Sequence, residues 1–255
     1  MAATGTTTGT GTGSTTTIML ETPAGQRISP AALQRLFAWL SPSFPVGAFS
    51  YSHGLEWAIE DGSVTSAADL VAWLGDVLRH GAGRNDAILF AHAYAAAHAD
   101  DIAGLRKLAE LGAAFQPSKE RRLESCAQGA AFLTAVNAAW PAPTLAALTE
   151  GLAHEPAVPY PVAVAMAAAA HGVPLAPALV AYLHAFAANI VSAGVRAIPI
   201  GQTDGQRTIA ALSPTIEAIA ASSLHAGLDD LGGAALRADI ASMKHETQYT
   251  RLFRS

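Results

Sequence analysis

Histidine is the commonest protein metal ligand, and the chain contains nine of them. None stands in a His-x-x-x-His or Glu-x-x-His pair, the spacings that place two ligands on one face of a helix. His80, His92 and His98 are likewise not spaced to share a helix face. We therefore expect neither a metal site nor a resident cofactor.

Ser50, Ser52 and His53 lie close together along the chain, as nucleophile and base do in some hydrolases. A nucleophile elbow, however, needs flanking glycines on a serine that follows a strand, and neither serine has them. The phosphate-binding pattern Gly-x-x-x-x-Gly-Lys-Ser/Thr is also absent from the sequence. The sequence therefore predicts a protein that is not an enzyme.

A segment rich in proline, glycine and aromatic residues runs from 45 to 56. Its prolines and glycines limit its flexibility, and pre-ordered aromatic side chains suit a binding anchor. Phe49 and Tyr51 fit that use, but they equally fit a plug at the end of a helical bundle. The candidate partner-binding residues of this segment are Pro45, Gly47, Phe49, Ser50, Tyr51, Gly54 and Glu56.

The last residues, 243–255, combine basic and large apolar side chains, the types that carry interface energy. They form either a second binding element or a solvated, frayed terminus. The candidates here are Lys244, His245, Glu246, Tyr249, Arg251, Leu252 and Phe253. Arg196 closes a long uncharged stretch, where a cation interacts favourably with the dipole at a helix C-terminus.

The elements that must position these residues are predicted to be helical. Hydrophobic residues make up 51% of the chain, alanine dominates, and residues that favour strands are sparse. The net charge of -5 and scattered basic residues lack the footprint of a nucleic-acid binder, so we expect no nucleic-acid partner. A lone cysteine, Cys126, excludes an internal disulfide framework and fits the cytosol.

Periodic apolar residues predict the individual helices. The clearest follows a capping box at Ser66–Asp69, with Leu70, Trp73, Leu74, Val77 and Leu78 on one face. Others are expected over 30–40, 55–60, 84–98, 101–113, 118–138, 143–153, 160–171, 176–196, 213–226 and 229–243. Short connections between them predict an all-α, single-domain antiparallel bundle of about nine or ten helices.

This domain is expected to span 29–242, between a disordered Thr- and Gly-rich head at 1–28 and the tail at 243–255. No Asp, Glu, Lys or Arg lies between Glu155 and Arg196, which would permit a membrane span by length. Five prolines and several polar residues interrupt that stretch, so two buried core helices are favoured over a membrane hairpin.

Several of these segments resemble, in order, the motifs of the urease accessory protein F family. They are the segment Ser41-Pro-Ser-Phe-Pro-Val-Gly-Ala-Phe-Ser-Tyr-Ser-His-Gly-Leu-Glu-Trp57 and the stretches that begin at Asn85, Ser118, Pro159, Arg196 and His245. The resemblance runs from about Leu33 to Ser255. It adds Arg121, Arg122 and Gln202, which lie inside these motifs, to the candidate binding residues. Ala48 departs from the family, which often has glycine there.

The resemblance implies a cytoplasmic, all-helical homodimer without cofactor. It would join accessory protein D (also called H) and accessory protein G on apo-urease, and support nickel insertion and carbamylation of the active-site lysine. In the family the C-terminal tail is thought to order on binding protein D/H. Protein G is the GTPase, in agreement with the missing phosphate-binding loop.

Three functions compete on this basis. The first is a non-catalytic chaperone that holds protein G beside the urease complex. The second is a GTPase-activating protein for protein G, for which an arginine would have to reach the nucleotide; the candidates are Arg121, Arg122, Arg196, Arg251 and Arg254. The third, a nickel carrier or an independent enzyme, is opposed by the missing ligand spacing.

Overall fold

The computed structural model describes residues 28–153 and 157–255. Those two ranges contain eleven α-helices and two short 3-10 helices, and they contain no strand. The all-α class predicted from composition and periodicity is therefore confirmed. Apart from Ile28, the predicted head lies outside the described residues.

The helices follow one another with short connections. In chain order they are α1 Pro30–Trp39, η1 Ala48–Ser50, α2 Leu55–Glu60, α3 Ala67–His80, α4 Ala82–His98, α5 Ile102–Ala114, α6 Lys119–Ala139, α7 Pro143–Gly151, α8 Tyr160–Ala170, α9 Leu175–Ala197, α10 Gln202–Ser223, η2 Leu228–Asp230 and α11 Leu236–His245.

Side-chain caps fix where several helices begin. The hydroxyl of Ser29 accepts a hydrogen bond from the amide of Ala32, and Ser66 and Ser118 accept from the amides of Asp69 and Arg121 in the same way. Ser66 also donates to the Asp69 carboxylate at 2.8 Å. These bonds satisfy amides that the first helical turn leaves without partners.

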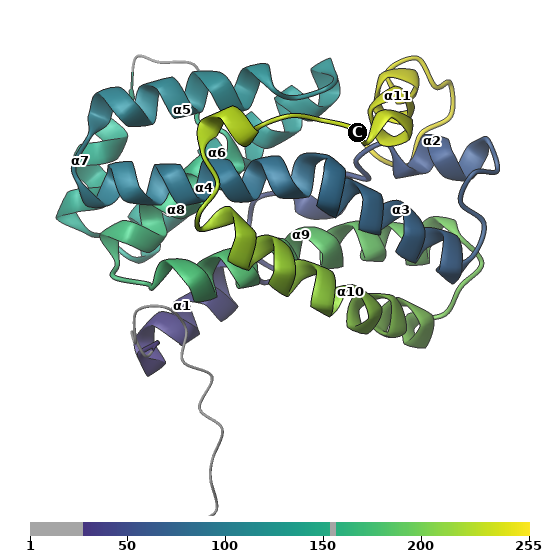
Figure 1. The fold of residues 1–255 in the computed structure, drawn as a ribbon, viewed down its shortest axis with the longest axis horizontal. Coiled ribbons are helices and arrows are strands. Elements are labelled where there is room, and N and C mark those ends of the chain that lie inside the picture. Colours follow the sequence, from purple (N-terminus) through teal and green to yellow (C-terminus); the bar gives the residue numbers. More distant parts are fainter. Residues whose placement is uncertain (1–27, 154–156) are drawn as a thin grey trace, which may run out of the picture.

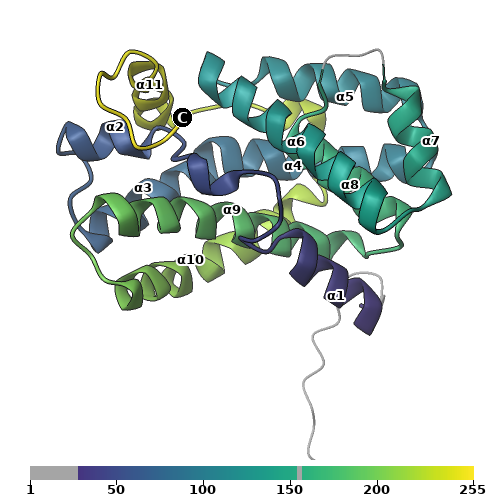
Figure 2. The ribbon, with the colours of Figure 1, turned by 180° about the vertical axis from the view of Figure 1, so that it is seen from behind.

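Helix α4 lies near the centre of the bundle and packs against α8, α5, α3 and α9 (Figure 1). Seen from behind, α6 crosses close to α8, and α9 runs beside α10 (Figure 2). At one end of the molecule α11 lies next to α2, and the chain's last residue lies beside both helices (Figure 1). The two segments singled out in the sequence therefore meet at this end.

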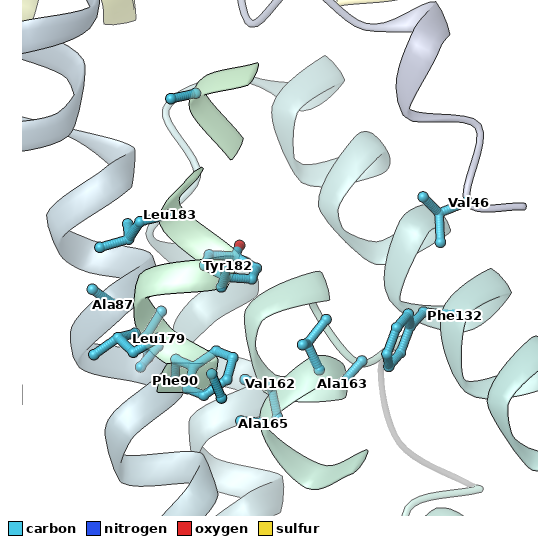
Figure 3. Close-up of a cluster of buried hydrophobic side chains, with 14 of the residues drawn as sticks. Val46, Ala87, Phe90, Phe132, Val162, Ala163, Ala165, Leu179, Tyr182 and Leu183 are labelled. Carbon is cyan, nitrogen blue, oxygen red and sulfur yellow. The ribbon is translucent and has the colours of Figure 1, made fainter. Parts of the chain in front are cut away.

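A chain of aromatic contacts links five helices through the core. Trp39 of α1 contacts Phe132 of α6 with ring centroids 6.0 Å apart, and Phe132 contacts Tyr160 of α8 at 5.7 Å. Tyr160 in turn contacts Tyr182 of α9 at 5.7 Å, and Tyr182 contacts Phe90 of α4 at 5.4 Å. Figure 3 shows Tyr182 and Phe90 among the buried aliphatic side chains around them. Such packing holds the helices in fixed relative positions.

The charge-free stretch forms α8 and most of α9. Most of α8 is buried, and α9 packs against α10, α4 and α2. Within the described ranges, α9 is the one helix long and apolar enough to cross a membrane, and half of its most apolar window is buried. In this fold both helices serve as core elements.

Two predicted boundaries were wrong. Helix α10 begins at Gln202 and not near 213. Pro214 does not mark the start of a helix but lies inside this one. The helix predicted over 229–243 begins only at Leu236. Before it, η2 and the glycines at 232 and 233 form a connection that is anchored to α3 by a 2.7 Å hydrogen bond from the Ala234 amide to the His80 carbonyl.

Candidate functional site

The loop of residues 43–54 takes its shape from two glycines with positive φ. Gly47 (φ 72°) precedes η1, and Gly54 (φ 77°) precedes α2. A Cβ added to Gly54 would lie 2.6 Å from the backbone nitrogen of Ser242 in α11, whereas one added to Gly47 would meet nothing within 4 Å. Gly54 is thus needed both for its backbone angle and for the close approach of α11.

The tail, residues 243–255, returns across α2 and pairs with this loop. The amide of Ser52 donates to the main-chain oxygen of Ser255 at 2.7 Å, and the amide of Arg254 donates to the carbonyl of Ser50 at 2.7 Å. The Ser52 hydroxyl donates to the same Ser255 oxygen. Loop and tail are therefore joined through their main chains, as two neighbouring strands would be.

The buried carboxylate of Glu56 fastens the tail to α2. One oxygen accepts the amide of Leu252 at 2.6 Å, and the other accepts the amide of Phe253 at 3.0 Å. The second oxygen also lies 3.0 Å from Nε2 of His245. Hydrogen bonds to an ionised acceptor are the stronger kind, and here they satisfy main-chain groups that have no helix or sheet of their own.

His245 ties α11 to two other helices. Its side chain is fully buried, and its Nδ1 lies 2.6 Å from a carboxylate oxygen of Glu120 on α6. The other oxygen of Glu120 pairs with Arg251 of the tail at 2.6 Å. The two ring nitrogens thus each face a carboxylate oxygen, one of Glu120 and one of Glu56. We call Glu56, Glu120, His245 and Arg251 the tail clasp.

A second buried group lies beside the tail clasp, around Glu124. This carboxylate contacts Arg121, His53 (2.7 Å to Nε2), Gln128 (3.0 Å to Nε2) and the hydroxyl of Ser255. Burial opposes its ionisation, but Arg121, His53 and Ser255 outweigh burial and lower the pKa of Glu124 to about 2. Burial and the neighbouring Arg121 lower the pKa of His53. Near neutral pH the group is an ion pair beside an uncharged imidazole.

Arg196 lies between loop and tail. Its guanidinium carbon is 3.6 Å from the ring centroid of Phe49 and 4.5 Å from that of Phe253, and its Nη2 donates to the Phe49 carbonyl at 2.9 Å. Cation–π contacts of this kind stabilise by roughly 0.5–2 kcal/mol. Arg196 thus does more than complement the dipole at the end of α9.

The candidate residues separate into two sets in the structure. Those buried within the chain are Tyr51, Gly54, Glu56, Arg121, His245 and Phe253, with Ser50 and Glu246 half-buried. Those exposed are Pro45, Gly47, Phe49, Arg122, Arg196, Gln202, Lys244, Tyr249, Arg251 and Leu252. The buried set, together with Arg196, Phe49 and Arg251, holds loop and tail in place. The remaining exposed residues supply side chains that face solvent.

Sequence reasoning missed Ser52, His53, Glu120 and Glu124 as members of this region. Glu120 and Glu124 are four residues apart on α6, so both point to one helix face. This i, i+4 spacing predicts that Glu120 and Glu124 form an acidic face on α6. Their partners in α11 and the tail, His245 for Glu120 and Ser255 for Glu124, lie more than a hundred residues further along the chain, and no local pattern indicates such a pairing.

Asp86 is a buried carboxyl next to this region. It accepts a 2.8 Å hydrogen bond from the Tyr182 hydroxyl. Burial raises the pKa of Asp86 to about 6, although Tyr182 and Arg121 counteract it. Among residues 28–153 and 157–255 no cluster of three potential metal ligands occurs.

In these positions the ionisable side chains pair with one another and with the main chain of the tail. The family model UreF matches residues 64–213. The chain belongs to the UreF family of urease accessory proteins, a family of accessory proteins and not of enzymes.

Relatives from several bacteria support this assignment. The chain is 55% identical over 225 residues to the urease accessory protein UreF of Bradyrhizobium sp. (strain ORS 278), which covers 88% of this chain and 92% of the relative. It is 56% identical to that of Rhodopseudomonas palustris (strain BisB5), with the same coverage. The protein of the same name from Xanthobacter autotrophicus (strain Py2) is 55% identical over 227 residues, 89% of this chain and 93% of the relative.

Replacing Gly54 by alanine tests the contact between loop and α11. Gly54→Ala adds a methyl group against the Ser242 backbone at a positive φ, so we expect a loss of several kcal/mol of unfolding free energy and release of the tail. Gly47→Ala, the matched control, strains φ alone and should cost only about 1 kcal/mol. Equal losses in urea unfolding would contradict the close approach.

Replacing Asp86 by asparagine tests its environment through pH. With a folded-state pKa of about 6 against about 3.9 unfolded, Asp86 stays protonated in the fold while the unfolded chain ionises. As the pH rises from about 4 to 6, the unfolded chain gains the charge on Asp86 before the folded chain does. The unfolding free energy therefore falls by about 3 kcal/mol in total over this range.

Asp86→Asn removes this dependence and keeps an acceptor for Tyr182. The free-energy advantage of the variant over the wild type should grow from near zero at low pH to a plateau above pH 6. Urea titrations at several pH values measure it, and an advantage that does not change with pH would refute the raised pKa.

Proposed function

We propose that the chain acts as a urease maturation chaperone that binds accessory protein D/H and accessory protein G on apo-urease and supports nickel insertion there. The observation that supports this proposal is that the loop and the tail, both candidate binding segments, form one surface stabilised by the tail clasp. A surface ordered before the partner arrives loses less entropy on binding. A cytoplasmic location follows from these partners.

Apolar side chains on this surface support a protein partner. The side chain of Tyr249 is fully exposed and that of Leu252 is 74% exposed. The main chain of Leu252 is nevertheless held by Glu56. On α11, Leu236, Ile240 and Met243 are exposed at positions i, i+4 and i+7, which is one helix face. Exposed apolar groups of this size, rimmed by charge, are typical of protein interaction sites.

The homodimer is part of the same proposal. A separate apolar pair, Leu33 and Phe37, is exposed on α1. In Figures 1 and 2 α1 lies away from the end of the molecule that carries α11 and the tail. A second copy could thus be bound without covering the surface proposed for protein D/H.

The alternative function, activation of the protein G GTPase, needs an arginine free to reach the nucleotide. Arg121 is buried against Glu124, Arg251 pairs with Glu120, and Arg196 lies between two rings. Arg254 is exposed and hydrogen-bonded to Tyr51. Of the candidate arginines, Arg122 on the exposed side of α6 is the one for which the described structure shows no ion pair, ring contact or side-chain hydrogen bond.

Truncating the exposed tail residues tests the chaperone proposal. The double variant Tyr249→Ala/Leu252→Ala leaves the clasp intact, because the Leu252 contact uses its main chain. If these side chains are anchors, each truncation costs more than about 1 kcal/mol, and capture of protein D/H should fall by tenfold or more in co-purification. Deleting 243–255 should abolish capture, but it also removes the buried His245 and Phe253.

Leu228→Ala, a 40% exposed residue of η2, is the matched control and should bind normally. Undiminished capture by the double variant would refute the assigned surface. GTP turnover by protein G, measured with wild type and with Arg122→Ala, separates the alternative. A rate increase that depends on Arg122 would favour the activating role over the chaperone role.

A further inference from the structure

A cavity of about 230 Å³ opens between the loop and helices α4, α6, α8 and α9. Its wall includes Asp86 of α4, the Arg121 and Glu124 pair of α6, Tyr160 of α8, and Tyr182 and Phe186 of α9. By exposed surface the wall is mostly apolar, although Gln128, His184 and Asn189 also line it. A mostly apolar cavity with a few convergent polar groups is the usual form of a small-molecule site.

Asp86 is the carboxyl of this wall that lacks a cationic partner. Glu124, the other carboxylate, is neutralised by Arg121. Asp86 receives only the Tyr182 hydroxyl on one oxygen, and its second oxygen has no partner among the described residues. Only 5% of the surface of Asp86 is accessible to solvent. A buried carboxylate in this position favours a positively charged ligand.

Two further polar groups of the wall are also unsatisfied. The Tyr160 hydroxyl has no hydrogen-bond partner in the described part of the chain, while its ring lies 5.7 Å from that of Tyr182. The imidazole of His53 donates from Nε2 to Glu124, and its Nδ1 is buried without a partner. Because His53 Nδ1 is itself enclosed, the acceptors open to a ligand are the oxygens of Asp86 and Tyr160, which suit a ligand that carries N–H donors.

The remaining wall distinguishes among cations. The aromatic rings of Tyr160, Tyr182 and Phe186 stabilise an organic cation through their faces. A dehydrated metal ion, by contrast, requires three or more side-chain ligands, and the described residues provide no such cluster. The apolar surface around the polar groups fits a short hydrocarbon chain.

We propose that this cavity binds a small primary amine in its ammonium form, with the charged head at Asp86 and Tyr160 and the hydrocarbon part against the aromatic wall. A primary ammonium group has three N–H donors, which matches the unsatisfied acceptors. The inference concerns a ligand of this chain alone and does not depend on the proposed chaperone role.

Binding of such a cation depends on the charge state of Asp86. The other titratable groups of the wall are Tyr182 and His184 from α9, Tyr160 from α8, Arg121 and Glu124 from α6, and His53 from the loop. Arg121 and Glu124 compensate each other. With a pKa of about 6, Asp86 is about one-tenth ionised at pH 5. Affinity for the amine should therefore fall by about tenfold between pH 7.5 and pH 5.

The test is a chemical-shift titration of the full chain with n-propylammonium chloride at constant ionic strength and pH 7.5. We expect saturable shifts of amides that line the cavity, such as those of Ala185 and Asn189. Asp86→Asn, which keeps the shape of the side chain, should weaken binding at least tenfold, since a hydrogen bond to a charged group contributes about 1.5–3 kcal/mol. Tyr160→Phe should weaken it severalfold.

Three controls make the outcome decisive. Asp239→Asn alters a carboxyl that lines neighbouring smaller cavities and not this one, so its amine affinity should equal that of the wild type. n-Propanol, of the same shape without charge, should not bind. Absence of saturable shifts, equal affinity of Asp86→Asn, or shifts produced by nickel chloride but not by the amine would each overturn the proposal.

Discussion

The Glu56 carboxylate supplies hydrogen-bond acceptors for main-chain amides of the tail, as the carbonyls of a neighbouring strand do in a sheet. It accepts the amides of Leu252 and Phe253 and a ring nitrogen of His245. Each of these contacts joins α2 to a residue about 190 positions further along the chain. Without this acceptor, buried main-chain amides would lose their partner, at a cost of about 1–3 kcal/mol each. The position of the tail, and of every exposed side chain on it, follows from this contact.

The surrounding charges make a buried carboxylate tolerable. Glu56 and Glu120 share the His245 ring, and the Arg251 guanidinium pairs with Glu120. Glu124 is matched by Arg121. Because removing one partner of a buried pair leaves an uncompensated charge, the clasp is sensitive to single substitutions. The same pairing explains why charged residues in these motifs are buried, although interface residues would be expected to face solvent.

The sequence predicted most of the helices, because their determinants are local. The Ser66 cap and the stripe from Leu70 to Leu78 lie within one segment, and α3 forms where expected. The start of α10 was missed because Pro214, normally a helix-start signal, is tolerated inside that helix. The buried roles of His245 and Phe253 were missed for another reason: they depend on α2, α6 and α9, and composition alone makes such residues look like interface anchors.

The central claim is that Glu56 holds the tail on this chain before any partner binds. Amide hydrogen exchange of the isolated protein, resolved at Leu252 and Phe253, tests it most directly. Wild-type protein should protect both amides well beyond the neighbouring exposed Tyr249 and Thr250, and Glu56→Gln should lose at least tenfold of that protection, since a neutral acceptor binds them more weakly. Unprotected Leu252 and Phe253 amides in the wild type would contradict the account.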